Sequence, residues 1–384
     1  MANPVLNAAA LGAMVSHAAH GASVVVLAAI VDALEGLSTS KRSGRGAFVA
    51  AALHILSPAG LFLSAPYAEA LFALLSFVGH LCYTQAWRRP SEPRDMSGNV
   101  WIVTAGAMFG LATAVRSNGL FFGLIFAYDA ALHGGIFVAT HPRLTTAMVC
   151  AVCATIAGAA MLLDPSLTTF SEPLHQPWII GAVLAFVSFL LSSLFLLPAL
   201  LGVRVSQSSS TSQQLFHLLA IVTAGTLIGA GSAYPQYLAW KEYCTTTTSP
   251  QRPWCTAIPP SITTFVQSHY WNVGPFRYWT LSNSPLFLLA APQLTILFVS
   301  AADGLRQGGL AARFALVQSV LALAALTSFH VQIVTRVASG YPLWYAWVAR
   351  GVEERKRWGQ WVVRWAVMYA LIQGVLYAGF LPPA

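Results

Sequence analysis

The sequence predicts an all-α polytopic membrane protein, a bundle of about 10–12 transmembrane helices with a loop cap. Of its 384 residues, 57% are hydrophobic and only 8% are charged, about a third of the charge usual in soluble domains. Apolar stretches of bilayer-spanning length recur along the whole chain. A soluble core cannot bury this much apolar surface, so a water-soluble enzyme and a nucleic-acid-binding protein are both excluded.

Each predicted span is a stretch of about 20 mainly apolar residues. The stretches are 4–35, 47–65, 67–87, 99–115, 119–140, 144–163, 178–203, 215–239, 285–302, 313–330 and 359–381. A shorter candidate at 338–351 contains Gly340 and Pro342 and either crosses or is re-entrant. No stretch is suited to a separate soluble domain. We therefore expect one transmembrane domain over 1–384, with 240–284 as a lumenal loop within it.

The basic residues sort the connections into two sides. Numbered alternately, one set holds fourteen Lys and Arg: Lys41, Arg42, Arg45, Arg88, Arg89, Arg94, Arg143, Arg204, Arg306, Arg313, Arg350, Arg355, Lys356 and Arg357. The other set holds five: Arg116, Lys241, Arg252, Arg277 and Arg336. Cytoplasmic loops carry the excess of positive charge, so the first set is predicted to be cytosolic. The alternation requires 338–351 to cross, and it places the start of the chain in the lumen.

The cysteines indicate one candidate disulfide. Cys244 and Cys255 lie 11 apart in the predicted lumenal loop, where an oxidising compartment permits a bridge. Cys82 lies on an apolar span. Cys150 and Cys153 have CxxC spacing within an Ala/Val-rich span and no second cysteine pair, which favours core packing over zinc or redox chemistry.

Polar residues gather at predicted lumenal helix ends. Glu69 follows the helix-breaking Pro66 and is either a helix cap or an acceptor for a sugar hydroxyl. Arg116 and Asn118 end the fourth span. An arginine there runs against the charge bias and suits a phosphate, although it is also typical of a side chain reaching lipid headgroups.

A second polar group follows in the later lumenal segments. Asn272, Arg277 and Tyr278 lie among aromatics, a pattern typical of a carbohydrate or polyprenyl surface and equally of an interfacial aromatic belt. His330 and Arg336, in the last lumenal connection, are candidates to complete the same site.

Other chemistries lack their motifs. The chain has no Asp-x-Asp pair for a metal-bound nucleotide sugar, no phosphate loop, no HExxH and no GxSxG. We therefore predict no metal site and no cofactor. A transporter or lipid scramblase is the alternative from another class; inverted repeats would favour it, but only Asp129 with His133 four residues later points that way.

Six stretches together resemble the GPI mannosyltransferase 2 (PIG-V type) family of the GT-C superfamily. They are SPAGLFLSAPYAEALFALLSFVG (57–79), AVRSNGLF (114–121), YC…RPWC (243–255), VGPFRYWTLSNSPLFLLAAP (273–292), HVQIVTRVASGYPLWY (330–345) and FLPPA (380–384). The resemblance implies a GT-C-like bundle in the endoplasmic reticulum membrane. It further implies transfer of the second mannose, in α-1,6 linkage, from dolichyl-phosphate mannose to the GPI precursor lipid, and possible assembly with a small accessory subunit.

On this resemblance, site roles follow as hypotheses. Arg116 and Arg277 are expected to hold the donor phosphate, Glu69 and Asn118 the sugar or acceptor hydroxyls, and Arg336 the acceptor's phosphate groups. Tyr278 is expected among the substrate-binding residues.

The chain departs from the family in one motif. The family's expected catalytic aspartate belongs to a Trp-Asp motif in the first lumenal loop, and no Trp-Asp dipeptide occurs here. Together with the lumenal start, this predicts a missing amino-terminal segment or a catalytically inactive family member or subunit. Glu69 and His330 are weak substitute candidates for the base.

Overall fold

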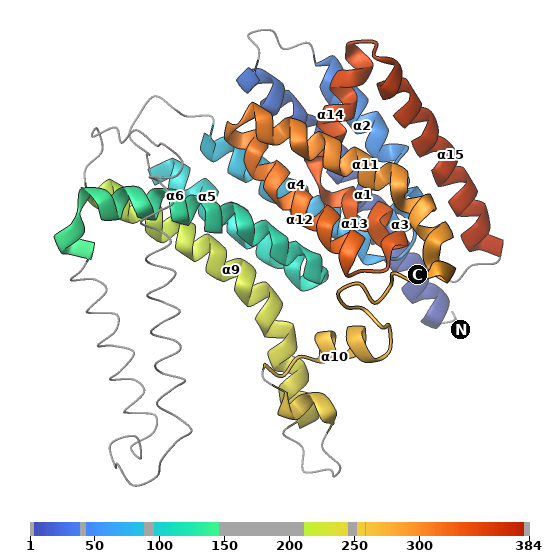
Figure 1. Cartoon of the computed structure of the whole chain (residues 1–384), viewed down its shortest axis with the longest axis horizontal. Helices are drawn as coiled ribbons and strands as arrows, with labels where there is room; N and C mark the ends of the chain where they lie inside the picture. The colour runs from blue at the N-terminus through green and yellow to red at the C-terminus, as the bar shows by residue number, and fades with distance from the viewer. Residues whose placement is uncertain are drawn as a thin grey trace. The chain divides into compact units, whose positions relative to one another are not determined.

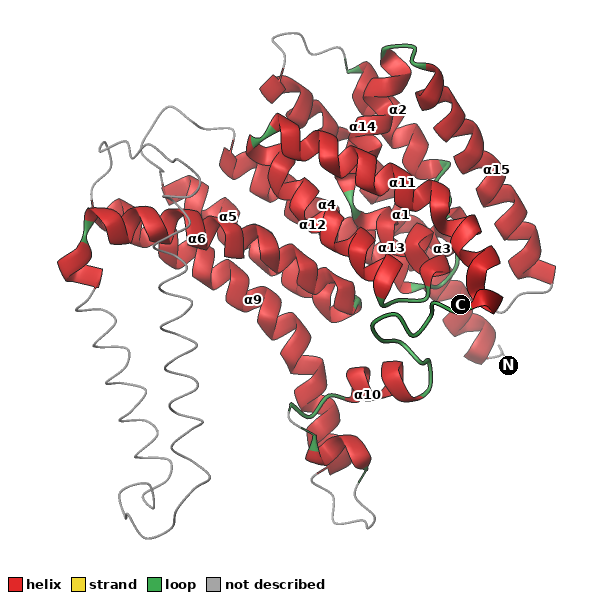
Figure 2. Ribbon diagram, viewed as in Figure 1, coloured by secondary structure: helices red, strands yellow, loops and turns green. Residues whose placement is uncertain are grey.

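The structure is a computed structural model that describes residues 4–38, 44–87, 96–145, 211–244, 252–257 and 259–379. Every regular element within these ranges is helical (Figure 2). Among the described residues, eight helices are long and apolar enough to cross a membrane. The protein is therefore an all-α, multi-pass membrane protein, as the composition predicts.

The membrane-length helices follow the predicted spans. They are α1 (Pro4–Ser38), α4 (Ala68–Trp87), α5 (Met96–Val115), α6 (Gly123–Thr140), α9 (Thr211–Cys244), α11 (Ser284–Gln307), α12 (Gly309–Thr327) and α15 (Arg357–Gly379). The shorter helices are α2 (Arg45–Ile55), α3 (Gly60–Ser64), α10 (Ile262–His269), α13 (Val334–Val337) and α14 (Pro342–Glu353). The 3₁₀ segments are η1 (Ser117–Phe122), η3 (Pro253–Thr256), η4 (Leu281–Asn283), η5 (Val331–Ile333) and η6 (Ala338–Gly340).

Two predicted spans lie outside the described residues: 178–203 entirely, and 144–163 apart from its first two positions. The predicted span 47–65 is divided into α2 and α3. Pro58 has no N–H to continue the helical ladder, and the Ser57 carbonyl and hydroxyl accept hydrogen bonds from the backbone N–H groups of Gly60 and Ala59 instead. The helix therefore ends before this turn and restarts after it.

The chain forms two compact units, 1–126 with 223–384 and 127–222. The expected single domain over 1–384 stays a prediction. In the first unit, α4 packs against both α1 and α5, and α11 lies beside α12 (Figure 1). Gly79 permits close approach of α4 to α5, since an added Cβ would lie 2.7 Å from the Phe109 ring. Phenylalanine side chains from α4, α5, η1, α6 and α12 are buried in the core: Phe72, Phe77, Phe109, Phe122, Phe126 and Phe314.

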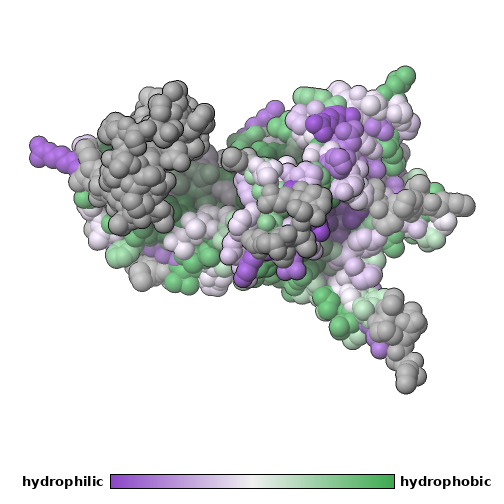
Figure 3. Space-filling model, turned by 90° about the horizontal axis from the view of Figure 1, so that it is seen from below, coloured by the Kyte–Doolittle hydropathy of each residue, from purple (hydrophilic) through white to green (hydrophobic). Residues whose placement is uncertain are grey.

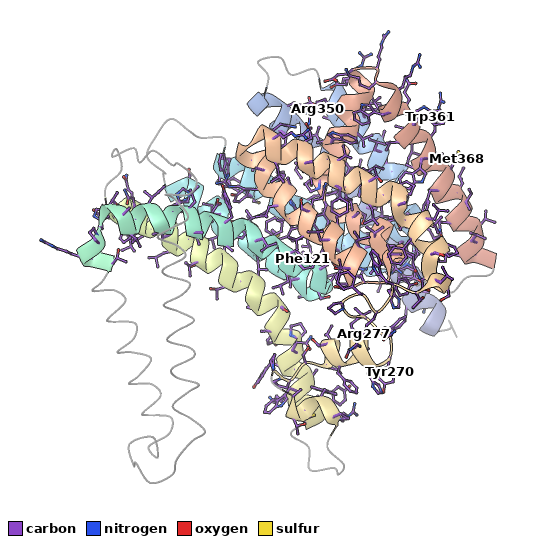
Figure 4. The ribbon with its side chains drawn as sticks, in the orientation of Figure 1. Phe121, Tyr270, Arg277, Arg350, Trp361 and Met368 are labelled. Atoms are coloured by element: carbon purple, nitrogen blue, oxygen red, sulfur yellow. A yellow bond between two sulfur atoms is a disulfide. The ribbon has the colours of Figure 1, made fainter. Side chains whose placement is uncertain are left out.

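Apolar side chains also cover the outside of the bundle. Trp361 and Met368 on α15 are 65% and 60% exposed and project outward (Figure 4), and hydrophobic residues occupy much of the surface in Figure 3. Such surface is unfavourable in water but is stabilised in a bilayer.

In the second unit, α6 and α9 place the His133 and His217 rings 5.0 Å apart, and Asp129 is buried.

The segment from η5 to α14 runs through the first unit from one end to the other. Its contacts advance steadily along the neighbouring helices: Arg336–Glu69, Gly340–Ser76, Trp344–Gln318 and Arg350–Asp303. At 12 residues, α14 rises only about 18 Å, too little to cross a bilayer by itself. The crossing of 338–351 that the charge count requires stays a prediction, and in the structure this segment is a broken helix. We name the two ends of the unit the Glu69 end and the Arg350 end.

Candidate functional site

Glu69 lies at the centre of the candidate site. Pro66 interrupts the chain after α3, and α4 begins two residues later, so Glu69 occupies the first turn of a long helix. A carboxylate is favoured there by the helix dipole. The side chain is only 1% exposed, and a buried carboxylate requires partners of opposite charge.

Two arginines supply those partners. Arg116 donates from Nη1 to Glu69 Oε1 over 2.6 Å. Arg336 donates to the same oxygen from Nε over 2.8 Å and from Nη2 over 2.6 Å. The arginine side chains are 19% and 11% exposed. One carboxylate and two guanidiniums leave a net charge of +1, which suits an anionic ligand.

Arg116 is placed by a turn that only small residues allow. It is the extended residue between α5 and η1. Gly119 follows within η1, where an added Cβ would lie 2.7 Å from the backbone nitrogen of Thr113. Asn118 is buried in the same turn, and its carbonyl accepts a hydrogen bond from the Tyr341 hydroxyl over 3.3 Å. The site therefore includes Asn118 beside Arg116.

Arg336 is held against aromatic rings. Its guanidinium carbon lies 4.1 Å from the centroid of the Phe62 ring and 5.4 Å from that of Tyr67. The Phe62 ring also contacts Tyr377 of α15, at 5.1 Å between centroids. A planar guanidinium can stack on a ring while its edge donates to a carboxylate, which fits arginine better than lysine at this position.

Three buried polar atoms at the site have no hydrogen-bond partner among the described residues. They are Glu69 Oε2, Arg116 Nε and Asn118 Nδ2. Buried polar groups are ordinarily satisfied. The set offers one acceptor and two donors, which matches a ligand carrying hydroxyls and an anionic group.

A second cluster lies in the loop before α11. The Tyr278 ring stacks on His330 at 4.6 Å, and its hydroxyl donates to Gln332 Oε1 over 2.6 Å. His330 Nε2–H donates to the Trp271 carbonyl over 2.6 Å. Partial burial raises the pKa of Tyr278, so the phenol stays protonated. This cluster is a stacked aromatic surface with a ring nitrogen already engaged.

Arg277 lies apart from the Glu69 cluster. Its side chain is exposed, on the loop that follows α10 (Figure 4), and it forms no ion pair with a described residue. The sequence grouped Arg116 with Arg277; the structure brings Arg116 together with Arg336. Position in the chain cannot reveal this, because Arg277 and Arg336 both lie in connections predicted to be lumenal.

Cys244 and Cys255 are joined by a disulfide, with their Cα atoms 5.5 Å apart. Cys82 is free and buried on α4, whereas Cys150 and Cys153 lie outside the described residues. Within the described part of the chain, no three His, Cys, Asp or Glu side chains gather as metal ligands.

Sequence reasoning missed Phe62, Tyr67 and Tyr341. The first two lie within the quoted stretch around Glu69 and the third within the stretch around Arg336, but an aromatic residue in an apolar span is indistinguishable from core. The one available signal was their place in the same short stretches as the two charged residues.

The sequence model of the family described as Mannosyltransferase (PIG-V) matches residues 1–168 and 205–305. The chain belongs to this mannosyltransferase family. GPI mannosyltransferase 2 of Gibberella zeae is 34% identical over 96% of this chain and 73% of the relative. The protein of the same name from Chaetomium globosum is 34% identical over 97% and 70%, and that from Aspergillus oryzae is 32% identical over 96% and 73%.

Among solved structures, the Archaeoglobus fulgidus oligosaccharyltransferase matches 96% of this PIG-V family chain and 40% of its own, with 15% identity and a TM-score of 0.37. Glu69 and Arg116 fall within the residues that the family model matches, whereas Arg336 lies beyond them. The protein is thus a multi-pass membrane glycosyltransferase of the PIG-V family, with a compact charged site at one end of its larger unit.

Proposed function

We propose that this chain transfers the second mannose, in α-1,6 linkage, from dolichyl-phosphate mannose to the GPI precursor lipid. The Glu69–Arg116–Arg336 cluster is the observation that carries the proposal, because it is a partly buried site with net positive charge in a mannosyltransferase. The three relatives described above are named GPI mannosyltransferase 2. The donor and acceptor are both lipid-linked, which suits a site at the end of a membrane bundle.

The departing dolichyl phosphate gains negative charge as the glycosidic bond breaks. Fixed guanidiniums aimed at that charge stabilise the transition state without reorganising. Arg116 and Arg336 are the two arginines placed for this, and their shared carboxylate keeps both in one orientation. Glu69 Oε2 and Asn118 Nδ2, which lack partners among the described residues, are assigned to substrate hydroxyls.

The acceptor hydroxyl also needs a base. Glu69 Oε1 accepts from two arginines, and Glu69 Oε2 is assigned above to binding a substrate hydroxyl. His330 Nε2 is engaged by the Trp271 carbonyl. The family's aspartate belongs to a Trp-Asp dipeptide that this chain does not contain. We therefore assign no described residue as the base.

We propose that the Glu69 end faces the lumen of the endoplasmic reticulum, because several basic residues of the described chain follow or flank helices at the Arg350 end, and an excess of Lys and Arg marks the cytosolic side. They are Arg306, Arg350, Arg355, Lys356 and Arg357. Dolichyl-phosphate mannose and the GPI precursor are the proposed partners, with a small accessory membrane subunit as a further candidate. No nucleic acid is expected to bind.

The test uses cells that lack their own second GPI mannosyltransferase. The chain is expressed as it stands and, in parallel, behind the amino-terminal segment of the Gibberella zeae relative. Surface display of a GPI-anchored reporter should return in at least one arm, and the one-mannose intermediate should disappear.

Rescue by the chain alone would show that it carries its own base. Rescue only with the added segment would show that the base is supplied by that segment. If neither arm rescues while both proteins reach the membrane in normal amounts, mannose transfer is the wrong function.

A further inference from the structure

The η6 turn interrupts the helical ladder in the middle of the first unit. Its residues Ala338, Ser339 and Gly340 are all buried. A broken turn at this depth leaves carbonyls that no water can satisfy, and each unsatisfied group is costly in an apolar interior. Trp344 Nε1 donates to the Ala338 carbonyl over 3.0 Å, and the Ser76 hydroxyl donates to the Gly340 carbonyl.

The η6 turn and Tyr341, which follows it, form hydrogen bonds to two residues of the Glu69 site, Arg336 and Asn118. On one side, the Ser339 hydroxyl donates to the carbonyl of Arg336 over 2.7 Å. On the other, Tyr341 donates to the carbonyl of Asn118 over 3.3 Å. A shift of the turn would therefore move Arg336 and release the contact with Asn118 together.

The turn is fixed from α4, the helix that also carries Glu69. Ser76 lies seven residues after Glu69, about two turns along the helix. Phe72, between them, packs so closely on Gly340 that an added Cβ would lie 2.6 Å from its ring. Helix α4 thus carries the Glu69 carboxylate in its first turn. Two turns later it contacts η6, which precedes α14 and follows Arg336.

We infer that Ser76 is a positioning residue for mannose transfer, which fixes the η6 turn so that Arg336 meets Glu69. The inference rests on the proposed function for its kinetic consequence, but the positioning itself is measurable without it. Ser76 touches no substrate in this scheme. Its effect passes through the Gly340 carbonyl to Arg336.

Ser76→Ala is compared with Thr84→Val on the same helix. Both hydroxyls are fully buried, but Thr84 donates to the His80 carbonyl within α4 and does not contact η6. Ser76→Ala should lower the rate of mannose transfer about tenfold, the loss expected for one buried hydrogen bond. Thr84→Val should change the rate by less than about twofold. Both variants are compared at equal protein amount and with their thermal unfolding measured.

A double-mutant cycle with Arg336→Lys separates positioning from general stability. If Ser76 acts through Arg336, Ser76→Ala should lower transfer by less than about twofold once Arg336 is lysine, because coupled residues are not additive. The same tenfold loss in both backgrounds would mean that Ser76 acts independently of Arg336, and would overturn the inference.

A second readout needs no enzymatic activity. Glu69→Cys and Arg336→Cys are combined, and a bifunctional methanethiosulfonate reagent links them, with the linked peptides measured by mass spectrometry. Ser76→Ala should slow linking severalfold, whereas Thr84→Val should leave it unchanged. Transfer is measured separately in the chain that keeps Glu69 and Arg336. If that chain transfers no mannose while Ser76→Ala slows linking in the double-cysteine chain, the positioning is retained and the proposed function is rejected. Unchanged linking would reject the positioning, whatever the transfer rate.

Discussion

The two ends of the larger unit use the same charged residue types in opposite ways. At the Glu69 end, one carboxylate that is 1% exposed binds two arginines that are 19% and 11% exposed. At the Arg350 end, the Arg350–Asp303 pair spans 3.4 Å with side chains 43% and 36% exposed. Lys356 and Glu354 pair there at 3.7 Å and are more than half exposed.

The difference follows from desolvation. A buried charge that loses its partner is strongly destabilising, whereas an exposed ion pair contributes about 0–1 kcal/mol. The Arg350 end therefore carries many charges that set orientation, each nearly dispensable. The Glu69 end carries few, and they depend on one another. The number of basic residues at an end predicts which side of the membrane that end faces. The burial of the charged residues indicates where the candidate site lies.

The largest expected effect comes from removing the shared carboxylate. Glu69→Ala leaves two partly buried guanidiniums without a counter-charge and should lower the free energy of unfolding by about 3–5 kcal/mol. Mannose transfer should fall by at least about a hundredfold. Thermal unfolding in detergent and the reporter assay measure these effects. Glu69→Gln, which keeps the shape without the charge, should be nearly as harmful, and a Gln variant with normal stability and transfer would contradict the charge-based explanation.

A smaller effect on the transfer rate is expected when position 336 keeps its positive charge but loses the planar guanidinium. Arg336→Lys replaces two donors to Glu69 and a flat face on Phe62 with a single ammonium. The loss of about 1.5–3 kcal/mol corresponds to roughly ten- to hundredfold in transfer rate. Arg350→Lys is the matched control at the other end, where the rate should not change measurably. Equal transfer rates for Arg336→Lys and Arg350→Lys would show that the arginine at the Glu69 end matters no more for transfer than the arginine at the Arg350 end.

Much of the fold was readable from the sequence because it depends on local composition. Apolar length predicted the eight membrane-length helices found within the described residues. Local composition could not show that 47–65 would be divided at Pro58 or that 338–351 would be divided into η6 and α14. Those outcomes depend on which neighbours satisfy the freed backbone groups, such as Ser76 and Trp344.

The site was readable only in part. Glu69 and Arg116 stood out because each is a charged residue at a predicted lumenal helix end. The pairing of Glu69 with Arg336 joins positions 267 residues apart, and no periodicity or spacing encodes a contact at that separation. Arg277 carried the same signal as Arg336 in sequence, yet it lies exposed on its loop. Only the packing of η6 on α4 distinguishes the two.

The smallest effect is expected at the Arg350 end. Arg350→Ala removes an exposed pair that should contribute no more than about 0.5 kcal/mol, and Asp303→Ala should behave alike. Their double-mutant cycle should give a coupling within about 0.5 kcal/mol, against several times that value for Glu69 with Arg336. Orientation should persist, because Arg355, Lys356 and Arg357 still follow α14. Thermal unfolding of the single and double variants measures the coupling, and a glycosylation acceptor inserted beside Thr256 checks the orientation. A coupling at the Arg350 end as large as that at the Glu69 end would show that side-chain exposure does not determine the coupling energy. Burial would then no longer distinguish the Glu69 site from the other ion pairs.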